Sequence, residues 1–284
     1  CVIDIDVPIN AGFYRSVRLI APEGTVAHCT PPSPVVGGWE THTRIVEVIF
    51  KALSQALPER VPAGTKGMIC HVGFGGERPG TQEYYTYLET LAGGYGGRHN
   101  ADGPDAVQTH FQNTQNAPIE ETEVNYPVRI TRLALIPDSE GPGKHRGGLG
   151  LCREYSFPEH EPVFTTLADR AKFAPSGLFG GGNGRLAHYE RIRGDLRVTI
   201  PSKGTTEVAI GERIRVETAG GGGYGPAWER DPELVLRDVI LEKVSPGRAR
   251  DVYGVAMDPT TGEVDQSETE RLRAALKSRE PGHS

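Results

Sequence analysis

The sequence predicts a mixed α/β fold of the α+β kind, rich in β-strands, with a few helices and long glycine-rich loops. The first observation is composition: the 284 residues include 37 glycines and 22 prolines, whereas these two types make up about 12 % of an average protein. The second is arrangement, because the glycines come in runs between short apolar segments with no fixed period, which excludes collagen and disfavours a helical bundle. The third is a hydrophobic content of 37 % beside 24 % charged residues, which indicates a folded chain long enough to bury a sizeable core.

The first part of the chain predicts short strands followed by one helix. Residues 1–36 are punctuated by prolines, and Arg18–Ala21 is one expected strand. A helix is expected from about Trp39 to Leu57, where Pro58 marks its end. Apolar residues recur in it at a spacing of four, which predicts one buried stripe: Ile45, Ile49, Leu53 and Leu57.

The middle of the chain predicts strands separated by glycine-rich loops. The first two expected strands flank a glycine turn and form a hairpin or a pair joined by a long loop. The expected strands are about Lys66–Phe74, Glu83–Leu91, Pro127–Ile136, Leu149–Phe157, Val163–Ala168, Leu196–Ile200 and Arg213–Thr218. Glycine runs directly after strands, such as residues 93–97, predict backbone that packs closely against a ligand or another chain.

Two helices are expected near the end. Asp231 is a typical N-cap residue, Pro232 suits the first helical position, and Pro246-Gly247 follows the expected end. The last helix is expected to start at the capping box Ser267–Glu270.

Charge and hydropathy exclude several classes of partner. The net charge of −6 leaves no basic excess for a phosphate backbone, so nucleic acid is not expected. No apolar run reaches the roughly 20 residues that cross a bilayer, and no signal peptide opens the chain.

The cysteines stand singly at Cys1, Cys29, Cys70 and Cys152, without a C-x-x-C pair. Free thiols in a long chain suit a reducing compartment, so a cytoplasmic location is expected, and two disulfides are the alternative. Because Cys1 opens the chain inside an apolar stretch, we expect a C-terminal piece of a longer protein or a processed subunit.

A nucleotide-binding loop is not indicated. No G-x-x-x-x-G-K-[ST] motif occurs. Gly220, Gly222 and Gly225 satisfy G-x-G-x-x-G, but Pro226 interrupts the run before the helix expected at Asp231. A tight turn packed against neighbouring backbone is the preferred interpretation.

Polar residues after the glycine run 93–97 suggest two kinds of site. A divalent metal could use His99, Asp102, Asp105 and His110, although solvated loop residues are the more common explanation for such a group. The amide-rich segment suits a site that grips a planar amide or a network that ties loops together; it contains Gln108, His110, Gln112, Asn113, Gln115 and Asn116, followed by Glu120 and Glu121.

Two basic positions lie further along the chain. Lys144, His145 and Arg146 stand between glycines and could hold a carboxylate or phosphate, or simply be solvated. Asp169-Arg170 suits either a buried ion pair or an anion clamp.

Taken in order, these motifs resemble the hydantoinase B / 5-oxoprolinase family over about residues 1–255, with a helical tail at 256–284. Each motif is weak alone, but the ordered series is specific. The matching stretches are Pro8–Gly12, Ile20–Gly24, Gly37-Gly38, Glu40-Thr41, Arg44–Val46, Ala56–Ala63, Glu89-Thr90, Gly93-Gly94, Gly96, Asp102-Gly103, Gln108–His110, Asn113-Thr114, Asn116–Glu120, Gly141–Gly143, Arg146–Gly150, Asp169-Arg170, Thr218 and Gly220–Gly225.

The resemblance implies the C-terminal portion of a B-type subunit. Members work with a hydantoinase A-type subunit that binds ATP with magnesium and phosphorylates a carbonyl or enol. The B half holds the substrate for hydrolysis of a cyclic amide. The expected partners are therefore an A-type subunit, the N-terminal half of the B-type subunit and further copies in a higher oligomer. Any divalent metal is expected outside this chain.

The resemblance also suggests roles for the candidate residues. Gln108, Asn113, Asn116 and Asp102 are expected to bind substrate. His110 is an expected catalytic residue that also helps to orient the ring amide. Glu120 is an expected acid or base, and Arg146 and Arg170 are expected to stabilise negative charge. Glu140 and Gly225-Pro226 depart from the family pattern. The alternatives are a subunit of an ATP-dependent acetone or acetophenone carboxylase and a purely structural assembly subunit.

Overall fold

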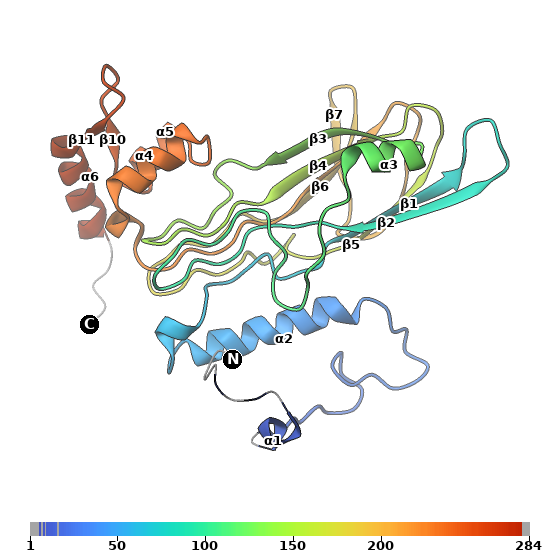
Figure 1. The fold of residues 1–284 in the computed structure, drawn as a ribbon, viewed down its shortest axis with the longest axis horizontal. Helices are drawn as coiled ribbons and strands as arrows, with labels where there is room; N and C mark the ends of the chain where they lie inside the picture. The colour runs from blue at the N-terminus through green and yellow to red at the C-terminus, as the bar shows by residue number, and fades with distance from the viewer. Residues whose placement is uncertain (1–5, 7, 9, 16, 280–284) are drawn as a thin grey trace.

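The computed structural model describes residues 6, 8, 10–15 and 17–279 and confirms a mixed, β-rich fold. Two antiparallel sheets form its body (Figure 1). The first has the strand order β2-β1-β5-β8, built from β1 (His71–Glu77), β2 (Tyr84–Thr90), β5 (Val163–Leu167) and β8 (Lys203–Glu207). The second has the order β3-β4-β9-β6-β7, built from β3 (Arg129–Leu135), β4 (Leu151–Ser156), β6 (His188–Arg193), β7 (Leu196–Thr199) and β9 (Arg213–Glu217).

The main hydrophobic core lies between these sheets. Alternate residues of β2 are buried, as expected for a strand with one covered face. Phe74 of β1 packs with its ring centroid 5.7 Å from that of Tyr155 on β4 and 6.2 Å from that of Phe164 on β5. These contacts join both sheets, so the apolar faces bury one another.

The expected strands are found with small shifts. The predicted hairpin is confirmed, since β1 and β2 pair antiparallel from His71–Thr90 to Glu77–Tyr84. Strands β6 and β8 and the short helix α3 (Ile119–Asn125) were not anticipated. The expected strand at Arg18–Ala21 is wrong, because this stretch has no regular structure and follows the short helix α1 (Ala11–Tyr14). The apolar stretch at the start lies mostly outside the described residues.

Extended glycine-rich segments lie side by side between the sheets and the C-terminal helices (Figure 1). We call them the glycine layer; it comprises residues 62–67, 93–97, 102–106, 139–150, 175–184 and 218–225. Backbone hydrogen bonds join its segments, for example from Gly94 N to Ala219 O at 3.0 Å and from Gly221 N to Gly148 O at 2.8 Å. The layer therefore satisfies its peptide groups through contacts between distant parts of the chain.

Close packing explains the glycines of this layer. A Cβ atom added to Gly221 would lie 1.9 Å from the carbonyl oxygen of Tyr95, and one on Gly94 would lie 2.1 Å from that of Gly148. Neither glycine has a positive φ, so space rather than backbone conformation requires glycine there. The close approach predicted from the glycine runs is found, and these contacts are with the chain's own backbone.

Helix α2 (Gly38–Leu53) lies on one side of the glycine layer and confirms the expected helix, four residues shorter than predicted at its end (Figure 1). Pro58 begins the 3₁₀ turn η1 (Pro58–Arg60). The predicted burial of the apolar stripe is wrong for its first two residues, because Ile45 is 41 % and Ile49 is 50 % exposed. Glu40 and Thr43 are buried instead.

The inner face of α2 carries charges. Glu40, Arg44, Glu47 and Lys51 follow one another at intervals of four, three and four residues, which places them on one side of a helix. The Oε1 atom of Glu40 accepts hydrogen bonds from the backbone of Ile69 and Cys70 at 3.1 and 3.3 Å. The charged stripe thus meets the protein and the apolar stripe faces away.

The C-terminal unit comprises a 3₁₀ turn, three helices and a small hairpin. It contains η2 (Ala227–Glu229), α4 (Pro232–Ile240), α5 (Pro246–Asp251), β10 (Ala256–Met257), β11 (Val264–Asp265) and α6 (Gln266–Arg279). The predicted cap is confirmed, because the Asp231 side chain accepts from Glu233 N. Pro246 does follow the end of α4, but it also opens α5.

The expected start of the last helix is corrected. Helix α6 begins at Gln266 rather than Ser267. The carboxylate of Asp265 accepts from Glu268 N at 3.0 Å, so this side chain caps the first turn.

A buried ionic cluster fastens this unit to the glycine layer. The Nε atom of Arg146 lies 3.0 Å from Asp238 on α4, and Arg230 lies 2.8 Å from the same carboxylate. Arg230 also makes a two-pronged contact with Asp102, and Arg146 contacts Asp105 at 2.9 Å. Although burial acts to raise the pKa of Asp102, the hydrogen bond and charge of Arg230 hold that pKa below its usual value.

Cys29, Cys70 and Cys152 are free thiols, and Cys1 lies outside the described residues. Within the described ranges, no helix has both the length and the apolar character of a membrane span.

Replacing Gly221 by Ala should destabilise the fold by about 3 kcal/mol, because the new methyl group would collide with rigid backbone. Thermal unfolding followed by circular dichroism measures the change. Gly38→Ala is the control, since an added Cβ there meets nothing within 4 Å. Equal melting temperatures for the two variants would contradict the packing argument.

Asp238→Ala should cost about 3–5 kcal/mol, because it leaves two buried arginines without their shared carboxylate. Denaturant unfolding gives the free energy of unfolding. Arg271→Ala, which removes a surface ion pair with Glu268, is the matched control and should change it little. A small effect at Asp238 would show that the cluster does not hold the C-terminal unit in place.

A cationic cavity beside helix α2

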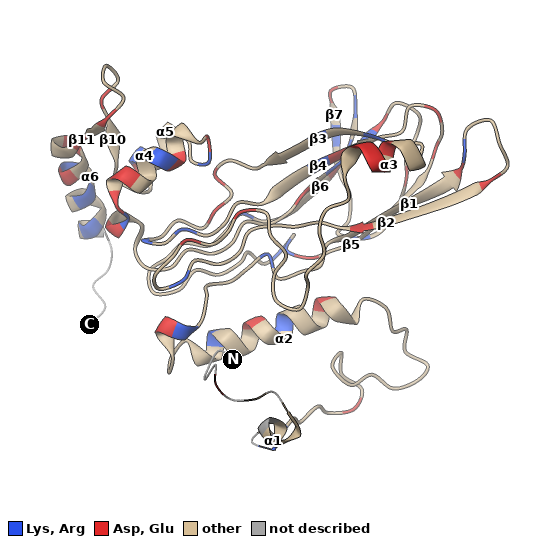
Figure 2. Ribbon diagram, viewed as in Figure 1, with Lys and Arg blue, Asp and Glu red and all other residues tan. Residues whose placement is uncertain are grey.

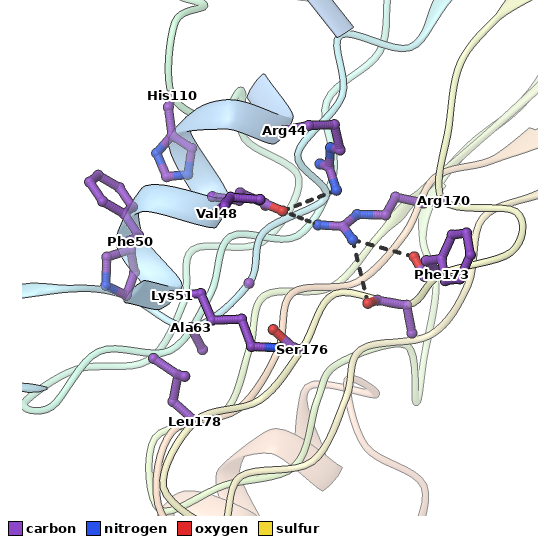
Figure 3. A pocket seen from close by; sticks show the side chains of 14 residues that line it. Arg44, Val48, Phe50, Lys51, Ala63, His110, Arg170, Phe173, Ser176 and Leu178 are labelled. Atoms are coloured by element: carbon purple, nitrogen blue, oxygen red, sulfur yellow. Dashed lines mark hydrogen bonds and ion pairs between the residues drawn. The ribbon is translucent and has the colours of Figure 1, made fainter. Parts of the chain in front are cut away.

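A cavity of about 320 Å³ lies between α2, the glycine layer and residues 170–178 (Figure 3). This volume is at the lower end of those that hold small ligands. Its walls are Arg44, Glu47, Val48, Phe50, Lys51, Pro62, Ala63, Gly64, His110, Arg170, Phe173, Ala174, Ser176 and Leu178. His110 and Arg170, which the sequence singled out separately, both line it.

Positive charge prevails in this cavity. Three cations, Arg44, Lys51 and Arg170, face one carboxylate, that of Glu47. Glu47 is fully engaged: Oε1 accepts from the backbone N and the hydroxyl of Thr65 at 2.9 and 2.6 Å, and Oε2 pairs with Arg170 and with Arg44. The remaining charge suits an anionic group in the cavity.

Arg170 forms a fixed part of the wall. It has a positive φ of 65° and is buried. Its guanidinium pairs with Glu47 and donates to the carbonyl groups of Thr65, Lys66, Phe173 and Ala174. Figure 3 shows the bonds that join it to Glu47, Phe173 and Ala174. Arg170 therefore contributes charge while its geometry is set by the protein.

Arg44 and Lys51 keep donor capacity. The Nε and Nη2 atoms of Arg44 are buried and have no hydrogen-bond partner among the described residues. Gly67 makes room for this guanidinium, since an added Cβ would lie 1.7 Å from Nη2. Figure 3 shows Lys51 extending toward the segment of Ser176, and no ion pair joins Lys51 to the described part of the chain.

His110 supplies a titratable group. Its Nδ1 atom lies 3.3 Å from the hydroxyl of Tyr95, and its buried Nε2 atom has no partner in the described structure. The ring packs edge-to-face on Phe50 with centroids 5.0 Å apart. Burial lowers the pKa of His110 below its ordinary value of 6.5, with Glu47 opposing and Arg44 reinforcing this shift. The imidazole is therefore neutral near pH 7 and able to take or give a proton.

The other residues of the amide-rich segment lie apart from this cavity. Gln108 accepts a hydrogen bond from the buried Nζ of Lys66 at 2.7 Å, and burial lowers the pKa of that lysine to about 8. Asn113 and Glu120 are exposed, and Glu120 lies in the first turn of α3. Asn116 is half-buried, with an Oδ1 atom that has no partner among the described residues.

Asp102 and Arg146 belong to the ionic cluster described above rather than to the cavity. The metal set considered from the sequence does not converge, because Asp102 and Asp105 face arginines and His110 faces Tyr95. Among the described residues, no three histidine, cysteine or acidic side chains are grouped to hold a metal ion.

Sequence reasoning missed Arg44, Glu47 and Lys51. A signal was present, because these residues and Glu40 repeat at helical spacing. It was overlooked because the neighbouring apolar stripe satisfied the ordinary expectation that apolar residues turn inward.

Comparison with known proteins identifies the family of the chain. A sequence model of the family described as Hydantoinase B/oxoprolinase matches residues 1–227. A relative from a Pseudomonas species, named as the B-type component of a D-/L-hydantoinase, is 36 % identical over 270 residues, which is 94 % of this chain and 45 % of the relative. The chain thus spans about half the length of this relative.

Two solved structures share the fold. The crystal structure of ATP-dependent caprolactamase from Pseudomonas jessenii matches with a TM-score of 0.81 and 28 % identity, over 96 % of this chain and 49 % of the caprolactamase chain. An acetone carboxylase structure matches with a TM-score of 0.69 and 19 % identity, over 81 % of this chain and 36 % of the other, and this likeness concerns the fold alone.

The extent of the family match, together with 36 % identity to a hydantoinase component along nearly the whole chain, shows that this chain belongs to the hydantoinase B/oxoprolinase family.

Proposed function

We propose that this chain forms half of the B-type subunit of an ATP-dependent hydrolase of cyclic amides. The observation that carries the proposal is the cavity that brings His110, with an unpartnered Nε2 atom, together with three cations. The proposed partner is an A-type subunit that binds ATP with magnesium, which is consistent with the missing phosphate-binding loop in this sequence.

The proposed reaction matches the charge of the cavity. The terminal phosphoryl group of ATP moves to the oxygen of the ring amide, and water then attacks the activated carbon. The ring C–N bond breaks as the nitrogen takes a proton, which leaves an acyl phosphate. A second water molecule then hydrolyses the acyl phosphate to a carboxylate and phosphate, with ADP as the other product. Negative charge gathers on oxygen at each stage, and the N–H groups of Arg44 and Lys51 are placed to stabilise it.

The residues have distinct proposed roles. His110 moves a proton to or from the reacting group, because neutral imidazole serves as acid or base near pH 7. Arg170 and Glu47 position the wall. We propose that Gln108, Asn113 and Asn116 orient the ring amide at the entrance, with Glu120 as a further acid or base. Because Arg146 and Asp102 are engaged in ion pairs of the ionic cluster, we propose that these two residues support the fold.

His110→Ala should lower kcat by about 10²–10⁴-fold, the usual contribution of a positioned acid or base. The measurement is ATP-coupled ring opening of hydantoin, 5-oxoproline and caprolactam by the assembled complex. His99→Ala is the control, since His99 is an exposed histidine outside the cavity.

Unchanged turnover in His110→Ala would remove the catalytic role and favour a structural assembly subunit. A parallel assay with acetone or acetophenone, with and without bicarbonate, tests the carboxylase alternative. Bicarbonate-dependent consumption of a ketone without ring opening would replace hydrolysis as the function.

The pH dependence follows from the direction of the His110 shift. Because burial lowers the pKa of His110 below 6.5, its base form persists at that pH and is lost only in more acidic solution. The acid limb of the kcat profile should therefore lie below pH 6.5 and be absent from the residual activity of His110→Ala. An acid limb that survives in the variant would assign it to another group.

A further inference from the structure

We propose that the outer face of α2, with residues 24–36 and Phe111 beside it, is the surface on which the other half of a B-type polypeptide docks. This inference rests on the proposal that the chain forms half of such a subunit. It concerns assembly, and it does not depend on the chemistry of the cavity on the opposite face of α2.

The first step is the orientation of α2. Figure 2 colours the four charged positions of α2. Glu40 bonds the backbone of Ile69 and Cys70, and the residues at positions 44, 47 and 51 line the cavity, so these side chains turn toward the protein. Two of its apolar residues turn away: Ile45 is 41 % and Ile49 is 50 % exposed. A helix at the surface of a complete globular protein has the reverse arrangement, with apolar residues inward.

The second step is that this face continues beyond the helix. A hollow of about 840 Å³ lies where residues 24–38 pass the start of α2 and Phe111. Exposed apolar side chains line it, including Val26, Val35, Val36 and Phe111. Trp39 and His42 also line the hollow, and Ile45 and Ile49 follow at the next helical turns. A connected apolar surface of this kind marks an interaction site.

The third step identifies the occupant. The chain aligns with relatives over nearly all of its own length but over only 45 % of the hydantoinase component and 49 % of the caprolactamase chain. These relatives therefore carry about as much polypeptide again. Permanent contacts within one subunit are large and apolar, like a core that has been divided, which is the character of this face.

The fourth step is the absence of a competing cover. Among the described residues, the sheets pack on each other and the C-terminal unit joins the glycine layer through ion pairs. Neither covers the outer side of α2. The segment from α1 to the start of α2 runs along that side in Figure 1, yet Ile45 and Ile49 remain 41 % and 50 % exposed. The occupant thus comes from outside the described part of the chain.

The test is co-expression of this chain with the tagged half of the P. jessenii caprolactamase chain that does not align with it. The wild-type chain should co-purify as a one-to-one complex, and the double variant Ile45→Asp/Ile49→Asp should lose at least nine-tenths of it. Circular dichroism and thermal unfolding check that the variant stays folded. The matched control is Val124→Asp/Ile240→Asp, which places two aspartates on exposed apolar positions of α3 and α4 and should keep the complex.

Three outcomes would overturn the inference. The wild-type chain could fail to co-purify, the α2 variant could bind as well as the control, or the wild-type chain could form a dimer that the α2 variant loses. The last would identify a second copy as the occupant. Because assembly is measured without substrate, loss of turnover in an intact complex would count against the proposed function alone.

Discussion

Close contact between backbones is the constraint on which the rest of this structure depends. In the glycine layer, carbonyl oxygens of one segment occupy the space in which a neighbour's Cβ would stand, as Tyr95 does at Gly221. Peptide groups from distant parts of the chain satisfy one another there, without a regular sheet. The layer lies between the two sheets and the C-terminal unit, and it supplies one wall of the cationic cavity.

Helix α2 connects the layer to the proposed function. Its charged side chains reach inward, where Glu47 bonds Thr65 and Arg170, while the Nε and Nη2 atoms of Arg44 have no partner among the described residues. Burying charges is costly unless they are paired, so the cavity, which is lined by three cations and one carboxylate, favours an added anion. The same orientation leaves the apolar side chains outside, which is favourable only when another surface covers them. The orientation of α2 about its own axis therefore accounts for both the cavity and the exposed face.

The sequence predicted the strands better than the contacts between them. Alternation of apolar residues located β3, and turn residues located the β1–β2 hairpin. Strand β8 was missed because Lys203–Glu207 contains a glycine and two threonines rather than an apolar alternation. Among the candidate site residues, proximity in sequence misled most: Asp102 and His110 are near neighbours in the chain, yet one binds Arg230 and the other lines the cavity.

By itself the sequence determined the β-rich class, most element positions, the helix cap at Asp231 and the family resemblance, because these depend on local spacing and ordered motifs. Only the tertiary structure decided which face of α2 turns inward, that Arg146 pairs with Asp238 across 92 positions of sequence, and that His110 and Arg170 share one cavity. The physical reason is that the spacing of apolar residues identifies the faces of a helix, but not which part of the protein packs against each face. Here the neighbour is the glycine layer, whose backbone offers polar groups at Thr65 and Gly67, and the polar face of α2 bonds to them.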